Sequence, residues 1–232
     1  MLLFILVKNV TINAMITEIT IGKDNKRSCF NEVLKEYDLS ARQIESLDDP
    51  LEKGDILFIQ GNIDSKNTDT LKQIKKLSRD GIHAILSIRT DIMKKAVSTK
   101  PFLICPYTED LEASCHTRIR NGNDAMRILV NMHDHSHGNI LMPYKDMMLF
   151  VCKDGRQFKT SLPYGEAVDN TYADESMIGG FIKEYLETAD YVKMFHYTVC
   201  AYSVSTHTGK PAGIKEIHDA YEMMKEKQLW MK

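Results

Sequence analysis

The chain has 232 residues, of which 43% are apolar and 27% charged, as in a globular protein with one substantial core or two small ones. Its net charge of −2 offers no electrostatic footprint for nucleic acid or for an anionic membrane. Five cysteines are widely spaced without a Cys-x-x-Cys pair, which favours reduced thiols in a cytoplasmic protein.

The first part of the chain contains two apolar runs typical of strands and one capped helix. Leu2–Val7 and Ala14–Ile21 are predicted strands. Met1–Val7 is too short to span a bilayer and lacks a basic leading region, so a buried first strand explains it better than a signal peptide. Ser40–Leu51 begins with a Ser-x-x-Gln capping box and is a predicted helix.

Strands and helices alternate from Gly54 onward. Continuous apolar runs predict strands at Ile56–Ile59, Ala84–Ile88 and Phe102–Ile104. The polar segment Thr68–Arg79 between the first two has apolar residues on one face and predicts a helix. Short unbroken apolar strands that alternate with helices indicate a parallel sheet covered on both faces, and hence the α/β class.

The remainder is predicted to be mainly helical, with a hairpin before the last third. A helix over Asp124–Met132 precedes strands at Ile140–Met142 and Met147–Val151. The Asp154-Gly155 pair is typical of a hairpin turn. The last three predicted helices are Ser176–Leu186, Tyr191–Val204 and Ile214–Lys227. Without an internal repeat or an evident linker, a single domain over 1–232 is the simplest organisation.

An acidic pair, Asp174 and Glu175, stands where the helix Ser176–Leu186 is predicted to begin. A helix start presents unpaired N–H groups and the positive end of the helix dipole, so it suits an anion such as a phosphate. A carboxylate at the same place can take a proton from an attacking hydroxyl. The structural alternative is that the two charges complement the dipole, worth ~0.3–1 kcal/mol.

Histidines alternate in the stretch His133-Asp134-His135-Ser136-His137. In an extended segment this alternation presents imidazoles to one side, and neutral imidazole is the commonest metal ligand, so a metal-binding module is one hypothesis. The stretch also fits a solvated polar loop between a helix and a strand, and Cys115 and His116 are not near it in sequence.

Several short phrases follow one another in an order and spacing typical of one enzyme family. They are Glu52–Leu57 with Gly61, Lys100–Ile104 with Pro106 and Glu109, Cys152–Gly155, Ser176–Phe181 and Tyr185–Thr188. In these the chain resembles the PfkB (ribokinase-like) carbohydrate kinases, in particular the 1-phosphofructokinase and tagatose-6-phosphate kinase branch. The resemblance implies a three-layer α/β/α fold with a mainly parallel sheet and a truncated lid. Residues 54–232 would match the C-terminal half of the family, and 14–28 would be the remnant of the lid strands.

The chain departs from this family at the turn that begins the catalytic helix. Family members have a Gly-Ala-Gly-Asp turn there, whose aspartate is the base and whose backbone amides hold the transferring phosphate. The matching positions in this chain are Tyr172, Ala173, Asp174 and Glu175. The resemblance therefore implies Glu175 and Asp174 as catalytic positions, and it predicts damage to the phosphate site because phosphoryl transfer depends on positioning and electrostatic stabilisation.

Three further departures concern the ligands. The family's glycine-rich loop along the nucleotide is replaced by Met142–Met147, and its Asn-Pro-Asn phrase near the metal by Cys105–Tyr107. The sugar-binding Gly-Gly-Lys-Gly phrase is absent from the sequence, and the early sugar-binding aspartate would fall near Thr11.

The resemblance also implies nucleotide-binding positions. These are Lys145, through a phosphate, and Ser203, Ser205 and His207, in the segment that borders the adenine and ribose. The structural alternatives are an exposed turn lysine and an ordinary helix-to-loop transition. No protein metal ligand is predicted, and ATP and Mg²⁺ are the cofactors only if the chain is active.

Two functions follow from the resemblance. The first is a degenerate sugar-phosphate-kinase-like protein with lost or greatly reduced phosphotransfer, acting as a binder, regulator or scaffold. The second is an active ATP-dependent hexose-phosphate kinase with Glu175 as base. The expected partners are a sugar phosphate and ATP, and a protein partner or a second copy of the chain.

Overall fold

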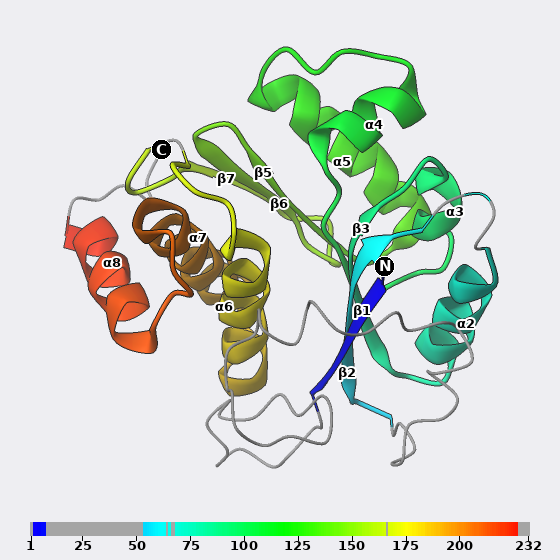
Figure 1. Ribbon diagram of the computed structural model, residues 1–232, viewed down its shortest axis with the longest axis horizontal. Coiled ribbons are helices and arrows are strands. Elements are labelled where there is room, and N and C mark those ends of the chain that lie inside the picture. Colours follow the sequence, from blue (N-terminus) through cyan, green and yellow to red (C-terminus); the bar gives the residue numbers. More distant parts are fainter. Residues whose placement is uncertain (1, 8–52, 64, 66–67, 166, 227–232) are drawn as a thin grey trace. The chain divides into compact units, whose positions relative to one another are not determined.

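The computed structural model describes residues 2–7, 53–63, 65, 68–165 and 167–226. They divide into two compact units (Figure 1). The first runs to Met142 and includes Val151–Arg156, and the second comprises Pro143–Phe150 and the residues from Gln157 onward. The predicted strand 14–21, the lid remnant 14–28 and the predicted helix 40–51 lie outside the described residues.

The sheet of the first unit confirms the parallel arrangement that the sequence predicts. Its strands follow chain order: β1 (Leu2–Val7), β2 (Ile56–Asn62), β3 (His83–Arg89), β4 (Leu103–Ile104) and the first part of β5 (Asn139–Tyr144). β1 is antiparallel to β2, and the pairs from β2 to β5 are parallel. Residues 56–59 and 84–88 are at most 1% exposed. This burial explains why both runs are apolar apart from Ser87.

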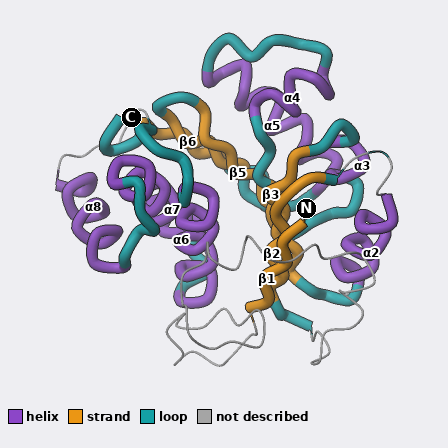
Figure 2. Tube along the Cα trace, viewed as in Figure 1, coloured by secondary structure: helices purple, strands orange, loops and turns teal. Residues whose placement is uncertain are grey.

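Among the described residues of the first unit, four helices occur (Figure 2): α2 (Thr68–Arg79), α3 (Met93–Val97), α4 (Thr108–Cys115) and α5 (Gly122–Ser136). The helix α2 has the predicted bounds. The sequence does not predict α3 and α4. The helix α3 has only five residues and lies in a stretch that looks like a lysine-rich connection. The helix α4 buries only Leu111, so its sequence has no apolar stripe that would indicate a helix.

The helix α5 continues past its predicted end at Met132 and includes His133–Ser136. The expectation that the histidine stretch is an extended segment or a polar loop is therefore wrong. The helix ends at His137, which adopts the left-handed conformation with φ 54°. Gly138 follows directly against the Pro101 carbonyl oxygen, where a Cβ atom has no room. This close approach fixes where the helix gives way to β5.

The described part of the second unit contains the strands β6 (Met147–Val151, its last residue excepted) and β7 (Gln157–Ser161) and three helices. The helices are α6 (Ala173–Glu187), α7 (Tyr191–Thr208) and α8 (Ile214–Glu226). The helix α7 extends past its predicted end at Val204 to Gly209, a left-handed cap with φ 64°. No helix in the described part of the chain is long and apolar enough to cross a membrane.

Aromatic side chains form the core of the second unit. The ring of Phe150 stacks on Phe195 with centroids 5.9 Å apart and an interplanar angle of 9°. It meets Phe181 of α6 edge-on at 5.9 Å and lies 6.2 Å from Phe158 of β7. These contacts join β6, β7, α6 and α7, because offset-stacked and edge-on arrangements are the favoured geometries of aromatic pairs.

The helices α6 and α7 lie side by side (Figure 1) and approach closely at Gly180. A Cβ atom on Gly180 would be 2.9 Å from Ala201 Cβ and 3.0 Å from the Tyr197 carbonyl oxygen. The sequence predicts tight packing of the Gly179-Gly180 pair against a strand or loop. The packing is confirmed for Gly180, but its neighbour is a helix, and Gly179 faces open space.

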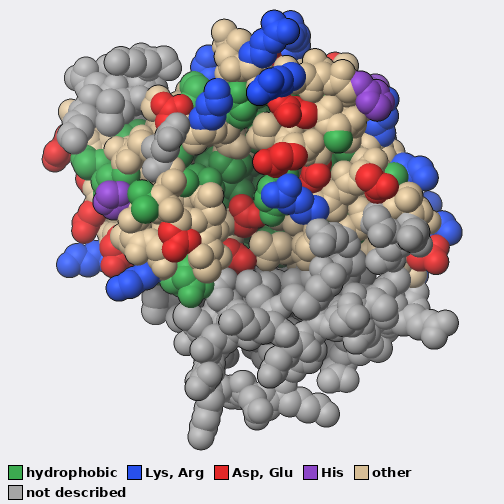
Figure 3. Space-filling view, turned by 45° about the horizontal axis from the view of Figure 1, so that its top comes forward, with side chains coloured by type: hydrophobic (Ala, Val, Ile, Leu, Met, Phe, Trp, Pro, Cys, Tyr) green, Lys and Arg blue, Asp and Glu red, His purple; other side chains and the backbone are tan. Residues whose placement is uncertain are grey.

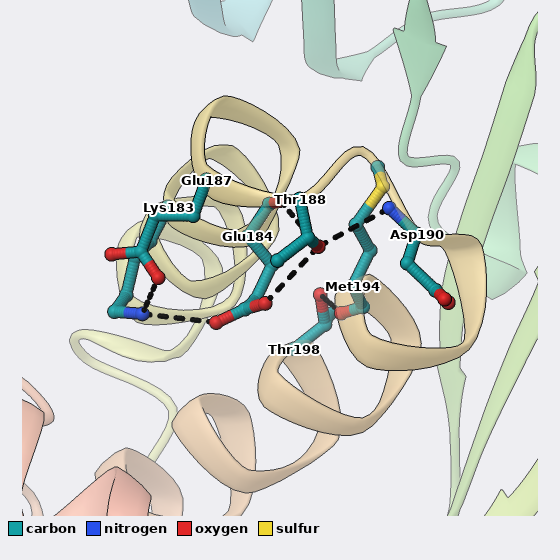
Figure 4. Close-up of polar contacts among 7 residues, drawn as sticks. All are labelled: Lys183, Glu184, Glu187, Thr188, Asp190, Met194 and Thr198. Atoms are coloured by element: carbon teal, nitrogen blue, oxygen red, sulfur yellow. Dashed lines mark hydrogen bonds and ion pairs between the residues drawn. The ribbon is translucent and has the colours of Figure 1, made fainter. Parts of the chain in front are cut away.

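A polar corner connects α6 to α7 (Figure 4). Lys183 Nζ donates to Glu184 Oε1 at 2.9 Å and to Glu187 Oε2 at 2.8 Å. Thr188 Oγ1 donates to the Glu184 carbonyl oxygen at 3.1 Å and accepts from the backbone N–H of Asp190. Asp190 Oδ1 then accepts from Val192 N at 2.8 Å and caps α7. The corner therefore provides hydrogen-bond partners for backbone groups at the end of α6 and at the start of α7.

The adjacent glycines of α6 offer a matched test of the close helix contact. Gly180→Ala should destabilise the protein by about 1–3 kcal/mol, because the methyl group overpacks the contact with α7. Gly179→Ala should raise stability by up to about 1 kcal/mol, since alanine favours a helix and the site is open. Urea unfolding of the two variants measures both. Equal effects of the two substitutions would contradict the close contact.

Candidate functional site

The first turn of α6 forms the centre of the candidate site. Tyr172 occupies the N-cap position with φ −120° and ψ 13°, and its side chain makes no capping hydrogen bond. Asp174 and Glu175 follow in the first turn, so the helix begins three residues before its predicted start at Ser176. Glu175 is only 7% exposed, and Asp174 is half-buried. The predicted acidic pair therefore does stand at a helix start.

Tyr202 of α7 extends toward the same end of α6. Its hydroxyl donates to Asn170 Oδ1 at 3.5 Å, just before the helix begins. Burial raises the pKa of Tyr202 to about 12, and the negative charge of Asp174 adds to this effect. The phenol, the Asn170 amide and the Asp174 carboxylate therefore lie close together, in a place where further negative charge is disfavoured.

The segment that precedes α6 is attached to the end of α7. The backbone N–H groups of Val168 and Asp169 both donate to the Thr206 carbonyl oxygen, at 3.2 and 3.0 Å. Asp169 Oδ1 accepts from Thr171 N at 2.8 Å and from Thr171 Oγ1 at 2.6 Å, which lowers the pKa of Asp169. The side chain of Asp169 also lies against Gly209. These bonds hold the entrance to α6 in a defined turn.

The loop after α7 is held by the first turn of α6. The backbone N–H of Ala212 donates to Ser176 Oγ at 3.1 Å. The start of the loop is fixed separately, because Gly209 N donates to the Ser205 carbonyl oxygen at 2.9 Å. The site thus has three parts within one unit: the start of α6, the segment 168–171 and the loop from Gly209 to Ala212.

The predicted nucleotide-binding residues of α7 differ in their exposure. Ser203 is buried, and its hydroxyl accepts from Tyr164 N at 3.2 Å. Ser205 is buried as well, and its hydroxyl has no hydrogen-bond partner among the described residues. His207 is exposed and stacks on the ring of Tyr164 with centroids 4.9 Å apart. Among these three side chains, His207 is the one that offers a surface to a ligand.

Lys145 lies in the tight turn between β5 and β6, with φ 53°. Its side chain is exposed, and its ammonium lies 5.3 Å from the centre of the Tyr144 ring. The backbone carbonyl oxygen of the next residue, Asp146, accepts a hydrogen bond from Leu162 N at 2.7 Å. Leu162 lies two residues before Tyr164. The turn and the Tyr164–His207 stack are thus joined by one short segment, while the nucleotide-binding role of these residues stays a prediction.

The segment Cys105–Tyr107, at the position of the family's Asn-Pro-Asn phrase, and the acidic residues after it lie in the first unit. Glu109 at the start of α4 pairs with Arg89 at 3.2 Å, and the Arg89 guanidinium stacks over the Tyr107 ring at 4.1 Å. Asp110 accepts from Thr90 N, and burial raises the pKa of Asp110. Within the described ranges, no group of three or more His, Cys, Asp or Glu side chains could hold a metal ion.

Charges of both signs are mixed on the molecular surface. On the face in Figure 3, basic and acidic side chains of the described residues are interspersed. This agrees with the net charge of −2. Neither sign of charge therefore dominates the described residues on this face.

The sequence does not single out Tyr202, Asn170 or Ser176 as site residues. Tyr202 lies inside a helix and Ser176 looks like an ordinary first-turn residue, so only the tertiary contacts reveal them. A signal does exist for Asp169, because Asp-Asn-Thr before a helix is typical turn chemistry.

Comparisons with solved structures identify the fold. The phosphofructokinase-2 of Escherichia coli in complex with substrates and products matches with a TM-score of 0.64 and 17% identity, over 79% of this chain and 60% of that chain. The same enzyme in complex with fructose-6-phosphate matches with a TM-score of 0.66 and 17% identity, over 79% of this chain and 59% of that chain. Arabidopsis thaliana ribokinase complexed with ribose and ATP matches with a TM-score of 0.52 and 13% identity, over 70% of this chain and 55% of that chain. The fold is that of the ribokinase-like sugar kinases.

The ribokinase-like α/β fold confirms the fold class expected from the sequence phrases. Protein-family models and curated proteins were also compared with the chain, and neither comparison finds a match. The chain spans 60% or less of the length of these three ribokinase-like structures. The likeness to them, at 17% identity and below, is one of fold.

The bond between Ser176 and Ala212 can be tested by itself. Ser176→Ala removes the acceptor of the Ala212 N–H, so amide hydrogen exchange at Ala212 should become about two to ten times faster, for a bond worth ~0.5–1.5 kcal/mol. The amide of Gly209, bonded to Ser205 within the same loop, is the internal control and should not change. Equal acceleration at both amides would mean that Ser176 supports the whole loop rather than this bond.

Proposed function

We propose that this chain is a sugar-kinase-like protein in which phosphotransfer is lost or greatly reduced, and that it acts as a binder, regulator or scaffold. The observation that supports this most is the first turn of α6. Tyr172 and Asp174 stand at the positions where the resemblance implies glycines, and Glu175 stands at the position of the base. The proposal follows from what these side chains do to an incoming phosphate.

A transferring phosphoryl group needs positive potential and free backbone donors at the helix start. Asp174 brings a carboxylate to this place, and its charge already disfavours ionisation of Tyr202. The same charge repels the phosphate of a nucleotide. Tyr172 adds a side chain at the entrance to the turn, where glycine would leave the backbone open.

The position of Glu175 supports the same conclusion. A base must reach the hydroxyl whose proton it removes, within about 2.6–3.2 Å. Glu175 is 7% exposed and carries one methylene more than the aspartate that the resemblance implies. A misplacement of this size can cost on the order of a hundredfold in rate.

The second candidate function is an active ATP-dependent hexose-phosphate kinase. It is favoured by one observation: a carboxylate, that of Glu175, does occupy the helix start at the position of the base. In this case Glu175 takes the proton of the sugar hydroxyl while the hydroxyl oxygen attacks the γ-phosphorus of ATP and ADP leaves. ATP and Mg²⁺ would be the cofactors of this second function, in which the metal would offset the negative charge of the phosphates.

Coupled measurement of ADP release distinguishes the two functions. With ATP–Mg²⁺ and fructose 6-phosphate, fructose 1-phosphate or tagatose 6-phosphate, the protein should release ADP no faster than its Glu175→Gln variant. Equal rates would identify any residual activity as a contaminant. Turnover by the wild type at about 1–100 s⁻¹, the ordinary range for kinases, that Glu175→Gln abolishes would overturn the proposal and establish the kinase.

The charge of Asp174 can be tested by binding. Asp174→Asn keeps the size of the side chain and removes its charge, so ATP affinity should rise about two- to fivefold, as expected for ~0.3–1 kcal/mol at a helix terminus. Asp80→Asn, at an exposed position just after α2 in the first unit, is the control and should leave the affinity unchanged. Thermal shifts over a range of ATP concentrations give the affinities. An unchanged affinity in Asp174→Asn would show that this carboxylate does not face the phosphates.

A further inference from the structure

The end of α5 arranges its three histidines differently from an extended chain. In a strand, His133, His135 and His137 would point to the same side. In the helix, residues two apart point in nearly opposite directions, and residues four apart are neighbours on one face. The helical geometry therefore pairs His133 with His137 and separates His135 from both.

The two paired rings are in direct proximity. The ring centroids of His133 and His137 are 6.5 Å apart, and the rings meet edge to face at 82°. His133 is half-buried, whereas His137 is exposed. A rotation of the exposed His137 side chain can thus bring its ring nitrogen to the position that a shared ion requires, at about 2.0–2.1 Å from each ligand nitrogen.

A backbone carbonyl determines which ring nitrogen of the neutral His133 side chain carries the proton. Its Nε2 lies 3.2 Å from the Lys153 carbonyl oxygen. A carbonyl oxygen can only accept, so Nε2 carries the proton and the neutral ring keeps its lone pair on Nδ1. Donation of the second ring N–H to a carbonyl is the arrangement that orients metal-binding histidines.

The carbonyl that orients His133 is itself held in place. Lys153 N donates to Asn139 Oδ1 at 2.8 Å, and Asn139 Nδ2 donates to the Phe102 carbonyl oxygen at 3.0 Å. Asn139 is fully buried at the start of β5. The carbonyl that orients the His133 ring is therefore anchored, through Asn139, to the start of β5.

The position on the helix also favours a cation. The two histidines belong to the last turn and the C-cap of α5, where unpaired carbonyl groups and the negative end of the dipole lie. We propose that His133 and His137 form a binding site for a divalent transition-metal ion such as Zn²⁺, Ni²⁺ or Cu²⁺. His133 Nδ1 and one ring nitrogen of His137 are its protein ligands, and water completes the coordination.

The composition of the site defines its kind. Structural zinc sites have four protein ligands, and no group of three or more His, Cys, Asp or Glu that could hold a metal occurs in the described part of the chain. The pair therefore makes an open site, with exchangeable metal. It lies in the first unit and is independent of the function proposed for α6.

Zn²⁺ binding to the full-length, untagged chain tests this site, with Cys115→Ser as background because Cys115 is an exposed thiol. Competition with a chromophoric chelator should give one Zn²⁺ per chain. His133→Gln and His137→Asn should each weaken binding about tenfold or more. Both variants preserve the local structure, since glutamine can still donate to Lys153 and asparagine tolerates the left-handed conformation of residue 137.

His135→Gln is the matched control, because His135 is exposed on the same helical turn but on another side. It should bind Zn²⁺ like the background protein. In the background protein, nitrogen NMR of the histidines should show the response to Zn²⁺ at Nδ1 of His133, with Nε2 still protonated. Equal loss of binding in all three variants, or no loss in His133→Gln and His137→Asn, would overturn the assignment.

Discussion

The close approach of α6 and α7 at Gly180 is the constraint on which the candidate site depends. The absence of a side chain there brings the backbone of α6 against Ala201 and the Tyr197 carbonyl oxygen. The aromatic contacts of Phe150 with Phe181 and Phe195 and the polar corner at Thr188 hold the two helices in that relation. Packing and hydrogen bonding therefore favour the same arrangement, as expected of a well-specified fold.

This arrangement brings the start of one helix to the end of the other. Bonds at that end then connect segments far apart in the sequence: Asn170 with Tyr202, Asp169 with Thr206, and Ser176 with Ala212. A helix start and a helix end have opposite partial charges, so their proximity shapes the local potential over a few ångströms. The chemistry of the site is therefore determined by the packing of the two helices behind it.

The elements with a strong apolar pattern could be predicted from the sequence, while those defined by tertiary contacts could not. The strands β2 and β3 and the helix α2 are examples of the first kind, because each buries a continuous or periodic apolar surface. The helix α4 buries only Leu111, so its apolar pattern is too weak to predict a helix. The helix α5 ends in polar histidines, so the apolar pattern predicts a helix that stops too early. At the site, the acidic helix start is visible in the sequence, but its neighbour Tyr202 lies inside the next helix, α7, and meets it only through the packing of the two helices.

The helix start of α6 has a consequence for competition between ligands. Asp174 is covalently part of the turn that would otherwise attract an anion, so its carboxylate is present at a high effective concentration whatever the solution contains. An anionic ligand would therefore have to compete with the Asp174 carboxylate for the start of α6, whereas a neutral or cationic group would not. On the proposed function, the protein supplies its own counter-ion to this helix dipole, and the turn discriminates against the ligands that helix starts usually select.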